Sequence, residues 1–135
     1  QIASGTDYTF TGLDIDCVEL NKEKAQTLSN KGYNTYHIDF LQFKTEKKYD
    51  RIIAAPPFKG NADIFHIQHM FELLKPKGII ISLTSPYWLT NNEKHQVDFR
   101  KWLESKEYYL NMVPDNSFVE KYKSVPTSII KIFKK

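Results

Sequence analysis

Cysteine, glycine and long apolar runs are all scarce in this sequence, and each scarcity excludes a class of protein. One of the 135 residues is a cysteine, Cys17, which cannot form a disulfide within the chain. No apolar run approaches the roughly 20 residues that cross a bilayer, and no basic-then-apolar leader opens the sequence. These absences argue against a disulfide-stabilised secreted domain and a membrane protein. They predict a soluble protein of the reducing cytoplasm.

The sequence also lacks a strong excess of one charge sign. It has 19 basic and 16 acidic residues, for a net charge of +3, whereas nucleic-acid-binding domains usually show a stronger basic bias. A function that involves nucleic acid must therefore depend on a local site. The length predicts a single domain, spanning residues 1–135, that is large enough to bury a core.

Apolar periodicity divides the chain into strands that alternate with helices. We expect strands at residues 13–20, 33–38, 49–54, 78–84, 108–113 and 127–133, and helices between the N-cap Asn21 and the stop residue Gly32, at 63–75 and at 92–105. This order predicts an α/β fold of the Rossmann-like class. Its sheet would be mostly parallel, with helices on both faces and an antiparallel C-terminal strand.

Two strand ends carry acidic residues, and ligands of open parallel sheets bind at the carboxyl ends of strands. Glu19 can accept hydrogen bonds from both hydroxyls of a ribose, although a helix-terminal acid held by the helix dipole explains it equally well. Asp39 can accept the exocyclic amine of an adenine, with Phe40 or Leu41 against the ring. An ordinary turn aspartate is the simpler explanation of Asp39 taken alone.

The third strand end is more specific. Pro56 and Pro57 stop the hydrogen-bonding ladder after the strand at 49–54 and build a rigid loop that projects Phe58. Carbonyl oxygens fixed in such a loop can accept hydrogen bonds from a planar amine and favour the pyramidal geometry that attack requires, while the aromatic ring can stack on a base. With a methyl sulfonium held in line, this loop predicts N-methyl transfer. A plain strand terminator is the alternative.

Four consecutive segments resemble the catalytic half of class I S-adenosylmethionine-dependent methyltransferases. They are the run at 49–58, the helix from Asp63, the sequence Leu74-Lys75-Pro76-Lys77-Gly78 that would end this helix, and the strand from Ile79. They are most similar to the N6-adenine DNA methyltransferases of restriction-modification systems, whose motif is Asn/Asp/Ser-Pro-Pro-aromatic. The resemblance covers nearly the whole chain. It implies methyl transfer from S-adenosylmethionine to the N6 amine of an adenine flipped out of DNA, with restriction-system subunits as further partners.

The resemblance also implies a role for each matching residue. Glu19 would hold the cofactor ribose, Leu20 would pack on the cofactor adenine, and Asp39 would bind the adenine amine beside Phe40. Pro56 would offer its carbonyl to the target amine, and Phe58 would stack on the target base. Ala55 and Pro57 complete the catalytic motif.

One departure from the family concerns the start of the chain. The five glycines are scattered, so the family's glycine-rich turn for the methionine end of the cofactor is not found. We interpret Gln1-Ile2-Ala3 as the end of the helix that follows that turn, which means that the first, central strand is expected to be missing as well. A sheet without it would have two further exposed edges, which predicts poor stability, a rearranged sheet or association with another chain.

The other departure is Ala55, which stands where the family has Asn, Asp or Ser. Its methyl group cannot accept a hydrogen bond from the target amine, so only the Pro56 carbonyl is left. The chain is therefore expected to be an inactive or impaired fragment, through a natural or a deliberate replacement. Two alternatives stay open: an RNA or protein N-methyltransferase with the same loop, and a catalytically dead methyltransferase-like binding module.

The remaining candidates are weaker. His66 and His69 lie three apart with Asp63 nearby, but nothing completes a tetrahedral metal site, so we expect no metal and assign them as half-exposed helix residues. Trp88 either borders the base pocket or, as we favour, packs in the core. Lys121, Tyr122 and Lys123 either meet DNA phosphates or form a solvated loop.

Overall fold

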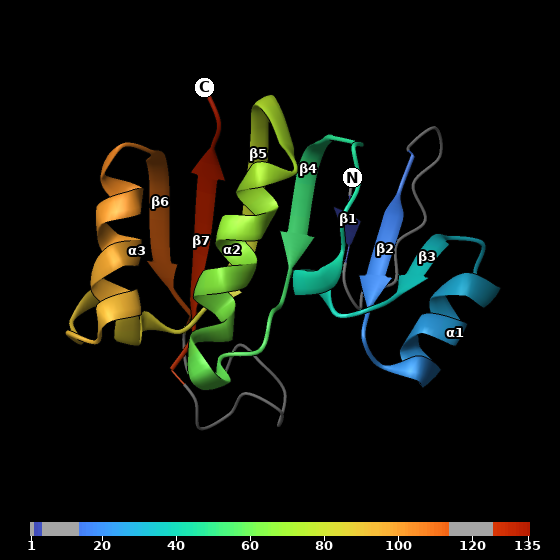
Figure 1. The fold of residues 1–135 in the computed structure, drawn as a ribbon, viewed down its shortest axis with the longest axis horizontal. Coiled ribbons are helices and arrows are strands. Elements are labelled where there is room, and N and C mark those ends of the chain that lie inside the picture. The colour runs from blue at the N-terminus through green and yellow to red at the C-terminus, as the bar shows by residue number, and fades with distance from the viewer. Residues whose placement is uncertain (1, 4–13, 114–125) are drawn as a thin grey trace.

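The computed structural model describes residues 2–3, 14–113 and 126–135, which form one seven-stranded sheet with three helices (Figure 1). The strands are β1 (Ile2–Ala3), β2 (Asp16–Glu19), β3 (Asn34–His37), β4 (Tyr49–Ala54), β5 (Leu74–Thr84), β6 (Glu107–Met112) and β7 (Ser128–Phe133). The helices are α1 (Lys22–Asn30), α2 (Ala62–Glu72) and α3 (Lys94–Glu104), with short 3-10 turns η1 (Phe40–Gln42), η2 (Lys59–Asn61) and η3 (Pro86–Leu89). None of the helices in this part of the chain is long and apolar enough to cross a membrane.

The strand order is β3-β2-β1-β4-β5-β7-β6. Neighbouring strands from β3 to β5 pair in parallel, whereas β7 is antiparallel to both β5 and β6. The predicted class, a Rossmann-like and mostly parallel sheet with an antiparallel C-terminal strand, is therefore confirmed.

The expectation that the central strand is missing is wrong. Ile2–Ala3 form strand β1 and do not end a helix, because Ile2 pairs with Asp16 of β2 on one side and with Ile52 of β4 on the other. Two residues are too few for periodicity to separate a strand from a helix end. The two additional sheet edges that we predicted, on β2 and β4, are therefore paired with β1 over its two residues.

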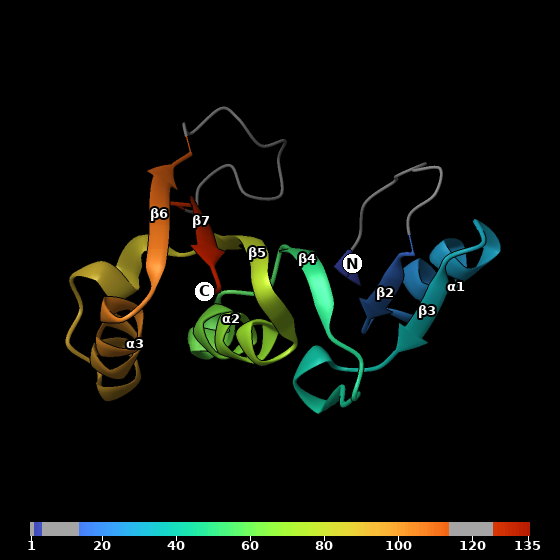
Figure 2. The same ribbon diagram turned by 90° about the horizontal axis from the view of Figure 1, so that it is seen from above.

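Helices cover both faces of the sheet, α1 on one and α2 with α3 on the other (Figure 2). The alternation of apolar side chains along β2 accounts for this arrangement. Ile15 and Cys17 pack with Leu28 of α1, whereas Val18 points into the larger cluster on the other face. A period of two residues is what a strand buried on both faces requires.

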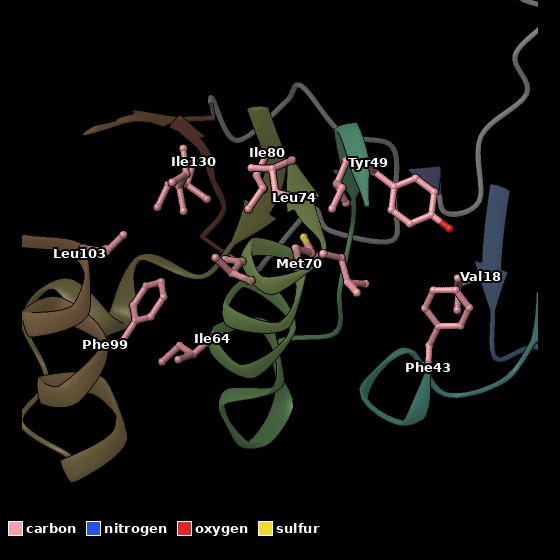
Figure 3. Packing of buried hydrophobic residues seen from close by; sticks show 14 of the residues in the cluster. Val18, Phe43, Tyr49, Ile64, Met70, Leu74, Ile80, Phe99, Leu103 and Ile130 are labelled. Atoms are coloured by element: carbon pink, nitrogen blue, oxygen red, sulfur yellow. The ribbon is translucent and has the colours of Figure 1, made fainter. Parts of the chain in front are cut away.

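The larger cluster fills the space between the sheet and α2 with α3, as Figure 3 shows. Ile64 and Met70 of α2 and Phe99 of α3 meet the strands there, and all three are buried. Trp88 is buried as well and packs edge-on against Phe99, with 4.9 Å between ring centroids. The favoured prediction of core packing for Trp88 is confirmed.

Local signals at the ends of α1 are also confirmed. The Asn21 side chain accepts a hydrogen bond from the Lys24 amide at 3.0 Å, and Gly32 has the left-handed φ of 94° that favours glycine after a helix.

The predicted end of α2 is wrong. The helix stops at Glu72, and residues 75–78 belong to the start of β5 because Leu74 already pairs with Tyr49. The pairing is irregular there, with Lys77 at a φ of 69° and its amide bonded to the Lys134 carbonyl at 2.7 Å.

Candidate functional site

The three strand ends predicted to bind ligands lie at one edge of the sheet. Strands β2, β3, β4 and β5 are parallel, so the segments that follow Glu19, His37, Ala54 and Thr84 all leave the sheet at its lower edge in Figure 1. Parallel sheets bind ligands at this edge because the loops there diverge and leave backbone groups available.

Two acidic residues lie at the ends of the neighbouring strands β2 and β3. The Ile38 amide bonds to the Glu19 carbonyl at 3.2 Å, which joins the two strand ends directly before Asp39. Glu19 accepts a hydrogen bond from the Asn21 amide at 3.2 Å, and Asp39 accepts one from the Leu41 amide at 3.0 Å. These local bonds orient both carboxylates.

Three residues close in sequence to Glu19 and Asp39 have exposed aliphatic side chains. Leu20 is 65% exposed, Ile38 37% and Leu41 36%. A carboxylate that can accept hydrogen bonds from ribose hydroxyls, a second that can accept one from an amine, and exposed aliphatic side chains on the same segments are groups that could hold an adenosine. Ile38 was not predicted as a site residue. The pattern that could have indicated it is an apolar residue between two polar ones directly at the end of a strand.

Phe40 has a different environment from Leu41. Its ring lies 4.8 Å from the His69 ring and 5.5 Å from the His66 ring, and it packs against the large core cluster. Phe40 therefore anchors η1 to α2, and Leu41 is the exposed member of the predicted pair.

His66 and His69 have the same anchoring function from the side of α2. A ring nitrogen of His69 lies 2.7 Å from the Phe43 carbonyl, and burial lowers the pKa of His66 while the nearby Asp39 carboxylate opposes that shift. No three metal-binding side chains gather anywhere in the described part of the chain.

The loop after β4 begins with the predicted motif. The strand ends at Ala54, as predicted, and Ala54 pairs with Ser82, so the following residues run beside the last residues of β5. Pro56 is buried, Phe58 is half-buried, and Ala55 and Pro57 are exposed. Proline rings remove amide donors and fix φ, so the backbone carbonyls of this segment are held in place.

A buried carboxylate, which the sequence suggested only as a neighbour of the two histidines, joins α2 to the end of β5. Asp63, in the first turn of α2, is 2% exposed and accepts hydrogen bonds from the Thr84 hydroxyl at 2.7 Å and the Ser85 amide at 2.8 Å. The Trp88 indole donates to the same hydroxyl at 3.0 Å. An acid in a first helical turn is a visible signal, but its partners 21 and 22 residues away are not.

A second buried carboxylate lies away from the site. Asp16 begins β2, at the opposite edge of the sheet, and accepts hydrogen bonds from Lys47 and Asn34 at 3.0 Å each. Burial would raise the pKa of Asp16, but hydrogen bonds from Tyr49, Asn34 and Lys47 outweigh it and hold the pKa below its ordinary value. We regard this group as structural.

Tyr87 is half exposed beside the buried Trp88. Lys121, Tyr122 and Lys123 lie outside the described residues.

No family model matches the sequence, whereas several solved structures share the fold. A protein of Listeria monocytogenes assigned as a class I S-adenosylmethionine-dependent methyltransferase is 14% identical, with a TM-score of 0.70 over 89% of this chain and 44% of that one. A modification subunit of a type I restriction enzyme from Vibrio vulnificus is 12% identical, with a TM-score of 0.67 over 89% of this chain and 32% of that one.

The N-methyltransferase NodS of Bradyrhizobium japonicum, solved with S-adenosyl-L-homocysteine, is 12% identical, with a TM-score of 0.57 over 89% of this chain and 66% of that one. At such identities the likeness shows the fold alone, and the fold is that of class I methyltransferases. This chain spans less than half the length of the Listeria and Vibrio proteins.

Proposed function

We propose that these residues are part of an S-adenosylmethionine-dependent methyltransferase that modifies the exocyclic N6 amine of adenine in DNA. One observation carries the proposal. The Pro56-Pro57-Phe58 loop leaves the same edge of the sheet as the neighbouring carboxylates Glu19 and Asp39, in a fold shared with class I methyltransferases.

The cofactor half of the site would use the ends of β2 and β3. Glu19 would accept hydrogen bonds from the ribose hydroxyls, and Asp39 would accept one from the adenine amine. The exposed side chains of Leu20, Ile38 and Leu41 would provide apolar surface for the adenine ring. When bound, S-adenosylmethionine supplies a methyl group on a positively charged sulfur. No residue is assigned to its methionine end, because residues 4–13, which follow β1, lie outside the described part of the chain.

The acceptor half would use the loop. The Pro56 carbonyl would accept an N–H of the target amine, which withdraws the nitrogen lone pair from the ring and directs it toward the methyl carbon. Phe58 would stack on the base. Transfer would form the new N–C bond as the S–C bond breaks, with the electron pair of the broken bond left on sulfur and the amine proton released to water.

Ala55 determines how well this half would work. A polar side chain there would provide a second acceptor for the amine, and the alanine methyl provides none, so we expect slow transfer. In mutagenesis of other enzymes, removing one hydrogen-bonding group that acts in the transition state costs roughly 10²–10³ in rate.

The test measures tritium transfer from labelled S-adenosylmethionine to duplex DNA that contains adenine. Ala55→Asn is expected to raise the rate by roughly 10²-fold, with Ala62→Asn, in the first turn of α2, as the matched control. Transfer to RNA or protein alone would reject DNA as the substrate and favour another N-methyltransferase.

A second candidate, a cofactor-binding module without catalysis, is favoured by Ala55 itself. It predicts that S-adenosylmethionine binds while neither the natural chain nor Ala55→Asn transfers the methyl group.

A further inference from the structure

The loop that carries the Pro-Pro-Phe motif ends in a left-handed turn. Gly60 has a φ of 65° and Asn61 a φ of 61°. Glycine adopts this conformation freely, whereas a residue with a Cβ atom is sterically strained in it. Apart from Asn61, the only non-glycine residue with a positive φ in the described part of the chain is Lys77. Asn61 is the N-cap of α2, yet its side chain makes no capping hydrogen bond.

The Asn61 side chain bonds instead to the first turn of α3. Its amide nitrogen donates to Glu93 Oε2 at 2.9 Å, and its oxygen accepts from Gln96 Nε2 at 3.3 Å. Glu93 is the N-cap of α3, and it too makes no capping hydrogen bond with its side chain. Both helices therefore give up side-chain capping for this cross-connection, which we call the Asn61 latch (Asn61, Glu93 and Gln96).

The charge of Glu93 sets the direction of both hydrogen bonds. A carboxylate only accepts, so Asn61 must turn its NH₂ group toward Glu93 and its oxygen toward Gln96. Gln96 must then present its own NH₂ group, which directs its oxygen elsewhere. Gln96 is 6% exposed, and its Oε1 is the buried side-chain atom left without a partner among the described residues.

Two unfavourable features thus meet at one contact, a left-handed asparagine and a buried acceptor without a donor. Such features persist where the surrounding structure enforces them, and they concentrate at functional sites. Here the contact lies three residues after Phe58, at the end of the loop opposite to β4. The apolar contacts of α2 and α3 with the core are made by other residues, among them Ile64, Ile67, Phe99 and Leu103.

We infer that Asn61 is a positioning residue whose latch to α3 holds the Pro56-Pro57-Phe58 segment in its acceptor-binding geometry. The assignment of that segment to the acceptor rests on the proposed function, whereas the latch itself does not. Helix α3 thereby becomes part of the acceptor half of the site, although it supplies no residue of the motif.

Asn61→Gly separates positioning from stability. Glycine accepts a φ of 61° at no steric cost, so the substitution relieves the strained backbone while it removes the latch. We expect the urea midpoint to stay within error of Lys77→Gly, which relieves a φ of 69° at the start of β5, away from the site. Trypsin cleavage after the exposed Lys59, followed by mass spectrometry, should be at least tenfold faster in Asn61→Gly and unchanged in Lys77→Gly.

Variants of Glu93 test the hydrogen bond itself. Glu93→Ala should accelerate Lys59 cleavage as much as Asn61→Gly does, whereas Glu93→Gln keeps an acceptor oxygen and should stay near the natural rate. The inference is overturned if cleavage after Lys59 is unchanged in Asn61→Gly, or if it rises only together with cleavage at every other site and a lower urea midpoint.

The functional readout compares the two halves of the site in the full chain. In Asn61→Gly, kcat/KM for adenine-containing DNA should fall at least tenfold, while the Kd of S-adenosylmethionine, measured by calorimetry, stays within twofold. Equal effects on both would contradict a role confined to the acceptor. If neither the natural chain nor Ala55→Asn transfers the methyl group to DNA, the proposed function fails, and Lys59 cleavage still decides whether the latch holds the loop.

Discussion

The Tyr49 hydroxyl donates to Asp16 Oδ2 at 2.6 Å, although their strands β4 and β2 are separated by β1 in the sheet. Figure 3 shows the hydroxyl of Tyr49 pointing from β4 toward β2. Ile2 pairs with both Asp16 and Ile52, so Tyr49 lies beyond the first paired residue of β1 and its ring reaches the second strand away. The bond joins the two halves of the sheet where β1 is short.

Removing this hydroxyl should therefore destabilise the fold. Tyr49→Phe leaves a buried carboxylate with one partner fewer, and hydrogen bonds to charged groups contribute about 1.5–3 kcal/mol. We expect a loss of about 2 kcal/mol in the free energy of unfolding, measured by urea denaturation. Tyr109→Phe is the control, because that ring is 55% exposed and its change should stay within about 0.5 kcal/mol. Equal losses in the two variants would refute the bridging role.

Stability should also depend on acid through Asp16. Its pKa is lowered in the fold from an ordinary value of 3.8, so the unfolded chain binds a proton at a higher pH than the folded one. The contribution of Asp16 is then fully present well above pH 3.8 and is lost as the pH falls through 3.8 toward the lower folded pKa. Between pH 6 and pH 3, Asp16→Asn should lose less unfolding free energy than the natural chain. If the unfolding free energies of the two proteins fall equally over this pH range, the lowered pKa of Asp16 is contradicted.

Cofactor binding should depend on the two carboxylates at the carboxyl edge. Glu19→Ala and Asp39→Ala each remove an acceptor for the adenosine group, and we expect the Kd of S-adenosylmethionine to rise roughly tenfold or more in calorimetry. Glu46→Ala, an exposed acid in the turn before β4, serves as the control and should leave Kd unchanged. The adenosine assignment fails if all three variants bind alike.

The Asp63 network should behave as one unit. Asp63→Ala removes the carboxylate that accepts from the buried Thr84 hydroxyl and Ser85 amide, which we expect to cost about 2–4 kcal/mol of unfolding free energy, at 1–3 kcal/mol for each donor that loses its acceptor. Thr84→Val and the double variant complete a cycle, whose coupling energy should exceed about 0.5 kcal/mol. Asp98→Ala, on the outer face of α3, is the control. Additive effects of the two substitutions would show that the pair does not act together.

Much of the fold could be predicted from the sequence because its causes are local. The bounds of β4 follow from two prolines that end a β-branched run, and the opposite faces of Cys17 and Val18 follow from the period of a strand. The predicted stop at residues 75–78 failed because pairing of Leu74 with Tyr49 overrides the breaker residues. A short strand such as β1 carries too little pattern to be recognised.

The residues of the candidate site could be predicted from the sequence, but their surroundings could not. Glu19, Asp39 and the Pro-Pro-Phe loop could be selected in advance, because residues at strand ends of a parallel sheet converge on one edge whatever the details of packing. The environments of the neighbouring side chains could not be predicted, because the Phe40 ring packs against His69 of α2 while Leu41 and Ile38 are exposed.

The sequence by itself determined the order of the strands and helices after β1, the edge of the sheet that carries the candidate site and the chemistry that its residues can offer. These depend on backbone sterics, side-chain period and functional groups, all of which act over a few residues. Only the tertiary structure decided the bonds from Asp63 to Thr84, from Asn61 to Glu93 and from Tyr49 to Asp16, which join residues 21, 32 and 33 positions apart. Such partners are chosen by how helices and strands pack, and packing depends on the whole chain at once.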